Sequence, residues 1–383
     1  MPANDPDVLI VGGGVVGLFC AYYLCLSGCE VVVVERGPAG GPQSCSHGNS
    51  GFVGTQGAAP LSEPFSLPAN ADPGLRAWLA HYRNAGDVTA ASALLLELKT
   101  QSLDILRTLR LSTFAATGMV LAFRTERGFE QARRCPPPLC VLSQDELNEL
   151  GLDVFGGLYN ADGGYLHAPE FMTELARMLE AMGVSIRQRE RVIGFETANS
   201  MITRVHTDLD EYRPHETVLA AGVDTVECAR KLGLELAVQP VKGYAVTVET
   251  TYTPKLPILL GEARVAVASL GDGRLRLAGG LELSGVDGSH VAVLDSVHSY
   301  LPHMKETGTA QVWSGLRPCT PDSLPLLGRA YPYRNLSVAC GHGTIGMGMA
   351  PASGRLIAQL LAGGGHTDMD LKPFRVDRYA AGA

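Results

Sequence analysis

The chain has 383 residues, of which 46% are apolar and 18% charged, and its formal net charge is −8. This length allows two domains or one large α/β unit, and the negative charge without a long basic run argues against nucleic-acid binding. The nine cysteines are odd in number and form no C-x-x-C, so we expect no disulfide framework and no metal site, but buried thiols in a reducing compartment.

The N-terminal stretch has the pattern of a strand, a glycine turn, a helix and a second strand. Residues 8–11 form an apolar run, residues 15–26 have the length of a helix, and residues 30–34 are rich in valine. A signal peptide or a membrane span is an alternative for such an apolar stretch. Asp5 and Asp7 and the absence of a basic start argue against both.

The turn itself matches the G-x-G-x-x-G pattern at Gly12, Gly14 and Gly17. In a dinucleotide site these glycines make the turn, let the backbone approach a pyrophosphate and let helix and strand pack closely. The helix start at Val15 offers N–H groups to phosphates, and Glu35 can accept hydrogen bonds from a ribose. A glycine turn inside an apolar core is the alternative interpretation.

Small and polar residues dominate the loop 36–51, which can wrap a cofactor or be an ordinary surface loop. The apolar stretch 217–221, closed by Gly222, predicts a second strand of the cofactor sheet, with Ala221 and Gly222 at its ligand-facing end. Between them we expect an irregular connection over 60–73, a capping box at Ser143 and a glycine-marked turn region over 156–166. Helices are expected over 75–83, 89–109, 125–134 (ended by prolines 136–138) and 169–182. Strands are expected over 119–123, 184–187, 191–195 and 202–207.

The last third is predicted to be rich in strands, with a hairpin over 265–280 and a helix over 290–301. Two stretches there are informative. One is Trp313 to Gly328, which contains Gly315-Leu316-Arg317-Pro318 and Thr320-Pro321-Asp322. The other is a strand over 337–339, a glycine turn through Gly341-His342-Gly343, and a helix to 361, whose start can also serve an electronegative part of a cofactor.

Several separated motifs resemble the flavin-dependent amine oxidase family that includes D-amino acid oxidase, glycine oxidase and sarcosine oxidase, and within it the small-subunit type of bacterial D-amino acid dehydrogenase. The resemblance covers nearly the whole chain. Besides the fingerprint and the two C-terminal stretches, it rests on Phe123-Arg124-Thr125-Glu126, Pro240-Val241-Lys242-Gly243-Tyr244 and Gly279-Gly280. In the segment 59–76 this chain is shorter than those dehydrogenases.

The resemblance implies an α/β fold in which a Rossmann-like FAD-binding domain is assembled from 1–79, 155–225 and 310–383. It implies an α+β substrate domain with a mixed or antiparallel sheet, from 80–154 and 226–309. It also implies FAD held non-covalently, since Cys319 is offset from the covalent-flavin cysteine of sarcosine oxidases. The implied cofactor-binding residues are Gly12, Gly14, Val15, Gly17, Glu35, Arg36, Ser44, Val192, Ala221, Gly222 and Gly315, with Asn49, Ser50, Gly51, Gly343, Thr344, Ile345 and Gly346 against the flavin ring.

Arg317 is the candidate for the substrate carboxylate, because a guanidinium offers two parallel donors; an arginine bridging two domains is the alternative. Tyr244 can add a phenol hydrogen bond or be a core tyrosine. His47 and His342 can line the flavin edge or be structural, and Lys242 can be solvated. We expect no essential acid/base residue, because the substrate amine needs only to lose a proton on binding.

The resemblance implies oxidation of a D-amino acid to an imino acid, which hydrolyses to a 2-oxo acid and ammonia, with electrons passed to a quinone or carrier. The alternatives are a dehydrogenase of D-hydroxyproline or D-proline, an oxidase of glycine or sarcosine, and the flavin-binding subunit of a multi-chain amine dehydrogenase. We expect a cytoplasmic protein. Peripheral contact with the inner face of the cell membrane and an oligomeric state stay open.

Overall fold

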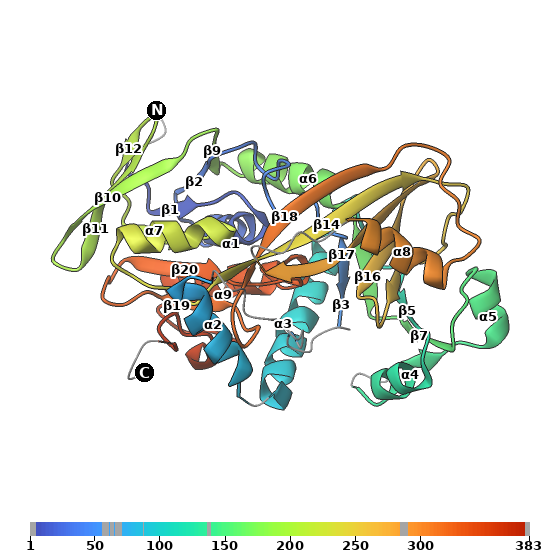
Figure 1. Ribbon diagram of the computed structural model, residues 1–383. Helices are drawn as coiled ribbons and strands as arrows, with labels where there is room; N and C mark the ends of the chain where they lie inside the picture. The colour runs from blue at the N-terminus through green and yellow to red at the C-terminus, as the bar shows by residue number, and fades with distance from the viewer. Residues whose placement is uncertain are drawn as a thin grey trace.

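A computed structural model describes residues 5–55, 61, 65, 71–86, 88–135, 139–283 and 290–379. The connection expected over 60–73 lies largely outside these residues, as does the proline run 136–138 that was expected to end a helix. Within them the strands form four sheets of six, three, eight and three strands (Figure 1).

The predicted N-terminal unit forms the centre of the six-stranded sheet. Its first strand is apolar throughout because both faces are covered, as is usual in parallel sheets: Ile10 packs on one face, and Leu9 and Val11 pack on the other. The strand over 217–221 is confirmed as its parallel neighbour. The order is β19 (Leu326–Arg329), β20 (Leu336–Cys340), β13 (Glu216–Leu219), β1 (Val8–Val11), β2 (Val31–Glu35) and β9 (Ser185–Gln188), with only β19 antiparallel to its neighbour.

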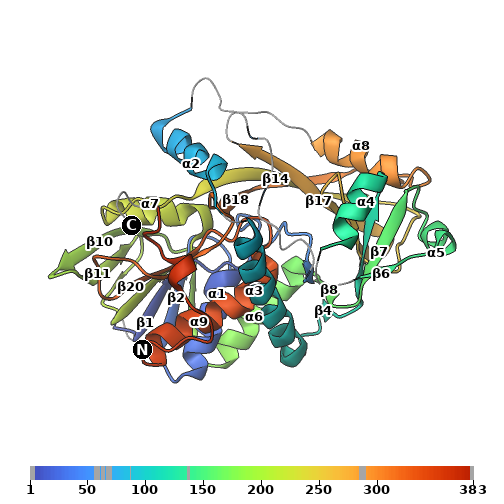
Figure 2. The same cartoon turned by 90° about the horizontal axis from the view of Figure 1, so that it is seen from below.

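Helices cover one face of this sheet, and a small sheet with one helix covers the other (Figures 1 and 2). The first face carries α1 (Val15–Leu26), α3 (Val88–Leu109), α6 (Ala168–Ala181) and α9 (Ala350–Ala362). The second carries α7 (Thr225–Lys231) and the strands β10 (Val192–Ala198), β11 (Met201–Thr207) and β12 (Glu211–Tyr212).

The eight-stranded sheet is mixed: only its β5–β15 pair is parallel. Helix α8 (His290–Tyr300) packs on one face, where Val293 and Val297 meet Val246 and Leu275. The predicted hairpin over 265–280 is confirmed as β16 and β17. The order is β18 (Gln311–Cys319), β14 (Gln239–Glu249), β17 (Arg274–Leu283), β16 (Val265–Gly271), β15 (Ile258–Leu260), β5 (Met119–Phe123), β7 (Gly156–Asn160) and β6 (Cys140–Val141).

The second three-stranded sheet joins β3 (Phe52–Gly54), β8 (Gly163–Leu166) and β4 (Phe114–Ala115). The capping box at Ser143 is confirmed at the start of α5. The remaining elements are α2 (Pro73–Arg83), α4 (Glu126–Arg133), α5 (Gln144–Glu149) and the 3₁₀ turns η1 (Gly222–Asp224), η2 (Gly346–Gly348) and η3 (Lys372–Phe374).

The prediction of a turn region over 156–166 is wrong, because most of this segment forms β7 and β8. Its glycines serve close packing. A Cβ on Gly164 would lie 2.2 Å from the carbonyl oxygen of Ala115, and one on Gly157 would lie 2.5 Å from a methyl group of Leu147. Glycine in a strand often marks such close approaches.

The predicted domain boundaries differ from the sheets at several elements. Strands β7 and β18, placed with the FAD domain by sequence, belong to the eight-stranded sheet. Helix α3, placed with the substrate domain, packs in the core that contains α1 and α9. Local patterns indicate a strand or a helix, but they do not say which sheet or core it joins.

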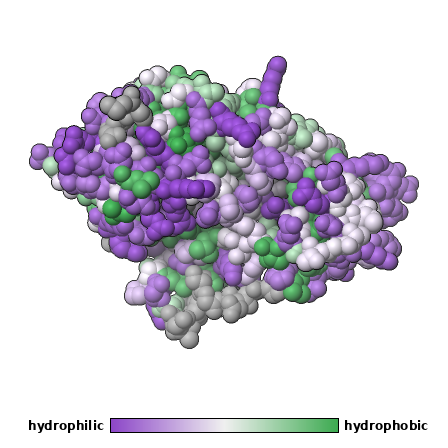
Figure 3. All heavy atoms as spheres, turned by 90° about the horizontal axis from the view of Figure 1, so that it is seen from above, coloured by the Kyte–Doolittle hydropathy of each residue, from purple (hydrophilic) through white to green (hydrophobic). Residues whose placement is uncertain are grey.

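The face seen in Figure 3 is mostly hydrophilic, and its hydrophobic patches are small and separate. Exposed apolar side chains come from distant parts of the chain: Leu209 is 71% exposed and Leu26 58%. Among the described helices, none combines the length and apolar character that a transmembrane span requires.

Candidate active site

The glycine turn after β1 is built by close backbone contacts. Gly12 has φ of +113°, and a Cβ there would lie 2.6 Å from the carbonyl oxygen of Ala220 in the neighbouring chain segment. A Cβ on Gly17 would lie 2.0 Å from the carbonyl oxygen of Gly12, so only glycine lets α1 come this close to the turn. Gly14 is the N-cap of α1 and has no side-chain cap. The turn itself therefore supplies no side-chain cap, and the start of α1 borders the adjoining cavity.

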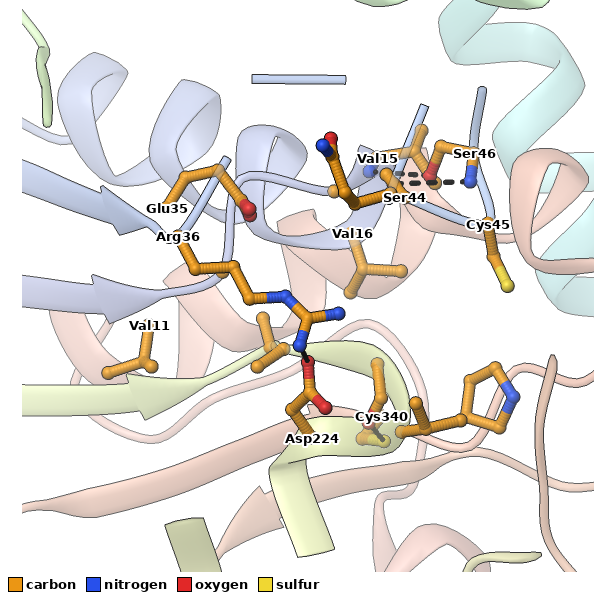
Figure 4. A pocket seen from close by; sticks show the side chains of 18 of the residues that line it. Val11, Val15, Val16, Glu35, Arg36, Ser44, Cys45, Ser46, Asp224 and Cys340 are labelled. Carbon is orange, nitrogen blue, oxygen red and sulfur yellow. Dashed lines mark hydrogen bonds and ion pairs between the residues drawn. The ribbon is translucent and has the colours of Figure 1, made fainter. Parts of the chain in front are cut away.

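The carboxylate of Glu35 is fixed at the end of β2. One oxygen accepts a hydrogen bond from the N–H of Gly13 at 2.7 Å, and the other accepts from the N–H of Gly37 at 2.9 Å. Glu35 and its neighbour Arg36 both line the cavity beside the turn (Figure 4). The acid is thus held where the fingerprint predicts a ribose-binding group.

Arg36 forms an ion pair with Asp224 of η1, at 2.8 Å between Nη1 and Oδ2 (Figure 4). Burial raises the pKa of Asp224, while the Arg36 guanidinium acts in the opposite direction. The pair joins the ends of β2 and β13 across the cavity wall. The sequence analysis missed Asp224, although its position two residues after Gly222 was a signal.

Two serines of the loop after β2 approach the start of α1. The hydroxyl of Ser46 accepts from the N–H of Val15 at 3.1 Å, and the hydroxyl of Ser44 accepts from the N–H of Ser46 at 3.2 Å (Figure 4). His47 lies in the same loop, but its Nδ1 is 3.2 Å from the carbonyl oxygen of Gly40. His47 thus ties the loop together and is not among the residues that line the cavities described next.

Two adjoining cavities, each of about 390 Å³, run from this turn into the eight-stranded sheet. The first cavity extends from Glu35 to His342, and the second extends from there to Phe123 and Arg264. Both volumes fall in the range of ligand sites. The two cavities share four lining residues, Cys45, Asn49, Gly315 and Gly343.

Most of the predicted site residues line these cavities. Gly17 and Gly51 do not; a Cβ on Gly51 would lie 1.9 Å from the carbonyl oxygen of Leu166, so this glycine is needed for packing. The first cavity is lined by Gly12, Gly14, Val15, Glu35, Arg36, Ser44, Asn49, Val192, Ala221, Gly222, Gly315, His342, Gly343 and Gly346. The second is lined by Asn49, Ser50, Gly315, Arg317, Gly343, Thr344 and Ile345.

Arg317 is a partly buried arginine whose guanidinium lies at the second cavity. Its Nη1 donates to the carbonyl oxygen of Gly280, and its Nη2 donates to that of Gly279 at 3.3 Å. A Cβ on Gly243 would lie 1.8 Å from Nη1, so glycine there makes room for the side chain. Burial lowers the pKa of Arg317, while the nearby Cys319, Cys45 and Glu282 act in the opposite direction. Its partners are strand carbonyls of one sheet, which does not support the domain-bridging alternative.

Tyr244 lies away from both cavities. It is 6% exposed and packs in the core beneath α8 together with Val246 and Val248. Its hydroxyl donates to a carboxylate oxygen of Glu282 at 3.0 Å. The structure therefore favours the core-tyrosine alternative over a contact with the substrate.

His342 lines the first cavity and is buried. Its Nε2 lies 3.0 Å from the hydroxyl oxygen of Ser353 in α9, and burial lowers the pKa of the imidazole to about 3. The ring is therefore neutral at physiological pH, and it connects the glycine turn after β20 to α9.

Cys319 is buried and does not line either cavity, and burial raises its pKa to about 12. The cysteine that lines both cavities is Cys45, whose thiol donates to the carbonyl oxygen of Leu316. Burial raises the pKa of Cys45 to about 11, so its thiol is protonated at neutral pH.

Lys99 and Arg264 also line the second cavity, and the sequence analysis missed both. With Arg317 they are the charged residues of a wall that is otherwise mainly apolar, and no Asp or Glu is among the described lining residues. For Lys99 a signal existed: it lies four residues after Leu95, on the helix face that Leu98 and Leu106 also bury. A lysine on the apolar face of a helix is unusual unless it has a role.

Fold and site together define a protein with the β-α-β fingerprint of dinucleotide binding, in which the cavity beside the fingerprint adjoins a second cavity with basic and apolar walls. The chain belongs to the family described as FAD dependent oxidoreductase (DAO), which matches residues 7–360. This finding confirms both the family resemblance and the predicted fold class.

Two curated relatives and one solved structure illustrate the similarity. The D-amino acid dehydrogenases of Paramagnetospirillum magneticum and Methylobacterium radiotolerans are 32% and 33% identical, covering 93% of this chain and 95% and 96% of theirs. Glycine oxidase from Geobacillus kaustophilus superposes with a TM-score of 0.75 at 24% identity, covering 98% of this chain and 100% of that one. At this identity the structural similarity shows the fold alone.

Proposed function

We propose that the protein is a D-amino acid dehydrogenase that holds FAD non-covalently in the first cavity and binds its substrate in the second. The observation that carries the proposal is Arg317, a partly buried guanidinium at the wall of the second cavity, which adjoins the first. The relatives at 32% and 33% identity, both named D-amino acid dehydrogenase, support the choice of substrate.

The residues of the first cavity fit FAD. The glycine turn leaves no room for a side chain at Gly12 and Gly17, Gly14 places no side-chain cap on α1, and two backbone hydrogen bonds hold Glu35 at the cavity. We propose that α1 receives the pyrophosphate, that Glu35 binds the ribose, and that Asn49 and Gly343, shared by both cavities, lie beside the flavin ring. FAD, when bound, supplies the acceptor for a hydride.

The second cavity orients the amino acid. The Arg317 fork can bind the carboxylate through parallel hydrogen bonds, which fix direction as well as charge. Apolar side chains such as Met119, Leu121 and Phe123 exclude water around the Cα–H bond. After the Cα–H bond breaks and the hydride leaves for the flavin, the imino acid is hydrolysed by water to a 2-oxo acid and ammonia.

An anaerobic reduction experiment tests this proposal. The purified yellow protein is mixed with D-alanine, D-proline, glycine, sarcosine or L-alanine, and loss of the flavin absorbance is followed by stopped flow. We expect D-alanine to reduce the flavin faster than L-alanine. Fastest reduction by D-proline would support the alternative of a secondary-amine dehydrogenase, and fastest reduction by glycine or sarcosine would support an oxidase of those substrates. No reduction by any of them would overturn the proposal and favour a subunit that needs a partner chain.

Non-covalent attachment has its own test. Because Cys319 is buried outside both cavities and Cys45 is held as a thiol, we expect all the flavin to be released when the holoprotein is unfolded in urea and filtered. Yellow colour that stays with the unfolded chain would show a covalent bond.

We further propose that the reduced enzyme passes its electrons to a quinone or another carrier, as the names of the curated dehydrogenases suggest. A quinone would require access at the inner face of the membrane. Reoxidation of the reduced enzyme by a soluble quinone much faster than by air would support this acceptor, and equal rates would count against it.

A further inference from the structure

Lys99 is a buried lysine in the wall of the second cavity. Its side chain is 5% exposed, and it comes from the middle of α3 rather than from the eight-stranded sheet that carries Arg317. The chain has six lysines, and this one alone is fully buried. Burying an ammonium group costs free energy that an ordinary packing role would not require.

The packing of α3 fixes where the amine can lie. One turn along the helix, the buried hydroxyl of Ser102 accepts from the N–H of Ala352 in the first turn of α9, at 3.1 Å. A Cβ on Gly348 of η2 would lie 3.9 Å from Cε of Lys99 and 4.0 Å from Cα of Val53 in β3. The amine therefore lies beside η2 and β3, which border the second cavity. Figures 1 and 2 show α3 standing between β3 and α9.

Burial lowers the pKa of Lys99 to about 7. The neighbouring elements β3 and η2 carry no titratable side chain. On α9, Arg355 is directed to Gln101 and Asp368, and His342 ahead of η2 is neutral. The other charged groups of the described cavity wall, Arg264 and Arg317, are cations, so they do not favour a charged Lys99. Because burial brings the pKa of Lys99 to about 7, a large share of the lysine is an uncharged amine at neutral pH, and this amine can accept a proton.

We propose, in contrast to the expectation from the sequence that no acid/base residue is essential, that Lys99 takes the ammonium proton of the bound amino acid before the amino acid is oxidised. This inference rests on the proposed function. A free amino acid enters as a zwitterion, and its Cα–H bond can be broken as a hydride only when the nitrogen has a lone pair. In this proposal the carboxylate binds to Arg317 on the sheet, and the ammonium group faces Lys99 on the α3 wall of the same cavity.

The proposed step balances. One N–H bond of the substrate breaks and its proton forms the third N–H bond of the Lys99 amine, giving a neutral substrate amine and a Lys99 ammonium. The Cα–H bond then breaks with its electron pair, which leaves as hydride to the flavin, while the nitrogen lone pair forms the C=N bond. The proton on Lys99 afterwards returns to solvent. The substrate is oxidised by two electrons and Lys99 changes only in protonation.

The test is the pH dependence of anaerobic flavin reduction by D-alanine in the holoenzyme. Lys99→Met keeps the length of the side chain without the base, and Lys99→Arg keeps a charge that cannot be lost. At neutral pH we expect both variants to reduce flavin about 10²-fold more slowly, and to recover in alkaline solution, where the free amino acid loses its own proton. Lys305→Met, at an exposed position outside both cavities, is the matched control and should follow the wild type.

Rates in Lys99→Arg close to wild type would overturn the proposal, because Lys99 would then act as a fixed charge. A pH profile of flavin reduction in Lys99→Met that runs parallel to the wild-type profile would also overturn the proposal. If the wild type is reduced by no amino acid at any pH, the proposed function itself fails, and that outcome is distinct.

A second readout needs neither turnover nor a stable variant. The protein is expressed with lysine labelled with ¹³C at Cε, and the Cε signals of its six lysines in the holoenzyme are followed by NMR as the pH is raised. We expect one signal to change near neutral pH and the other five to change in alkaline solution. Six alkaline transitions would overturn the proposal even if both Lys99 variants failed to fold.

Discussion

Glu35 shows how one carboxylate can set both the shape and the chemistry of a site. It occupies the N–H groups of Gly13 and Gly37 at once, so it holds the glycine turn in place before any ligand arrives. A group that is already held in place loses less conformational entropy on binding, and this raises affinity.

We expect Glu35→Ala to weaken the binding of FAD. The variant loses the ribose partner and leaves the two backbone N–H groups without their acceptor, which should cost about 1.5–3 kcal/mol, or roughly 10- to 100-fold in Kd. Titration of the apoprotein with FAD, followed by flavin fluorescence, measures the change. Glu35→Gln keeps one acceptor oxygen and should lose less. Equal Kd values for Glu35→Ala and the wild type would contradict a role in cofactor binding.

Arg317→Met should raise KM for the amino acid while FAD stays bound. The lost contact is a charged, bidentate one, which corresponds to about 3 kcal/mol or more, or on the order of 10²-fold. Arg317→Lys keeps the positive charge but lacks the two parallel donors of a guanidinium, so its KM should lie between those of the wild type and Arg317→Met. Steady-state kinetics together with the flavin content of each protein check this, and an unchanged KM would remove Arg317 from carboxylate binding.

Residues in a local pattern could be predicted from the sequence, and residues placed by tertiary contacts could not. Gly12, Gly14 and Glu35 follow from spacing within one β-α-β unit. Tyr244 shows the limit: alternate residues of a strand face opposite sides, and the sequence does not say directly which side is the core. Val246, two residues further on, shares its face, and that apolar neighbour was the available hint.

At the scale of elements, the crossing of α1 and α9 holds both glycine turns in position. Gly354 of α9 lies against the backbone of α1, where an added Cβ would be 2.4 Å from the carbonyl carbon of Phe19. Backbone cannot move aside as a flexible side chain can, so the crossing distance depends on this glycine.

We therefore expect Gly354→Ala to destabilise the protein by about 1–3 kcal/mol, the usual range for overpacking, and to weaken FAD binding. Gly194→Ala is the matched control, since a Cβ there would meet no atom within 4 Å. Urea unfolding of both variants checks the prediction. Equal midpoints would mean that α9 can shift without cost.

The elements themselves were easier to predict than their partners. The strand over 217–221 was assigned to the cofactor sheet correctly, because apolar strands that end in glycine before a helix are typical of that sheet. Strand β18 was not recognised as part of the other sheet, since its pairing with β14 joins residues far apart in sequence. Long-range pairing is set by the packing of the whole chain and leaves a weak local signal.

At the scale of the whole molecule, the stability should depend on pH through His342. The imidazole has a pKa of about 3 in the folded protein and 6.5 as its ordinary value. Between these values the unfolded chain binds the proton and the folded protein does not. Stability is therefore fully present above about pH 6.5 and falls as the pH drops toward 3.

His342→Gln removes this titration and can keep a polar group toward Ser353. Below about pH 6.5, the ordinary pKa of a histidine, we expect the free energy of unfolding to fall more steeply in the wild type than in the variant. The difference should reach up to about 1.4 kcal/mol for each pH unit. Urea titrations at neutral and mildly acidic pH measure the difference, and parallel losses in the two proteins would contradict the assignment.

The cofactor cavity draws its walls from Glu35 near the start of the chain, from Asp224 in the middle and from Gly343 near the far end. During synthesis on the ribosome, the early β-α-β unit thus emerges long before the segments that complete its pocket. Flavin loading then has to follow the emergence of the second glycine turn, and a nascent chain stalled before residue 343 should gain no protection from protease when FAD is added.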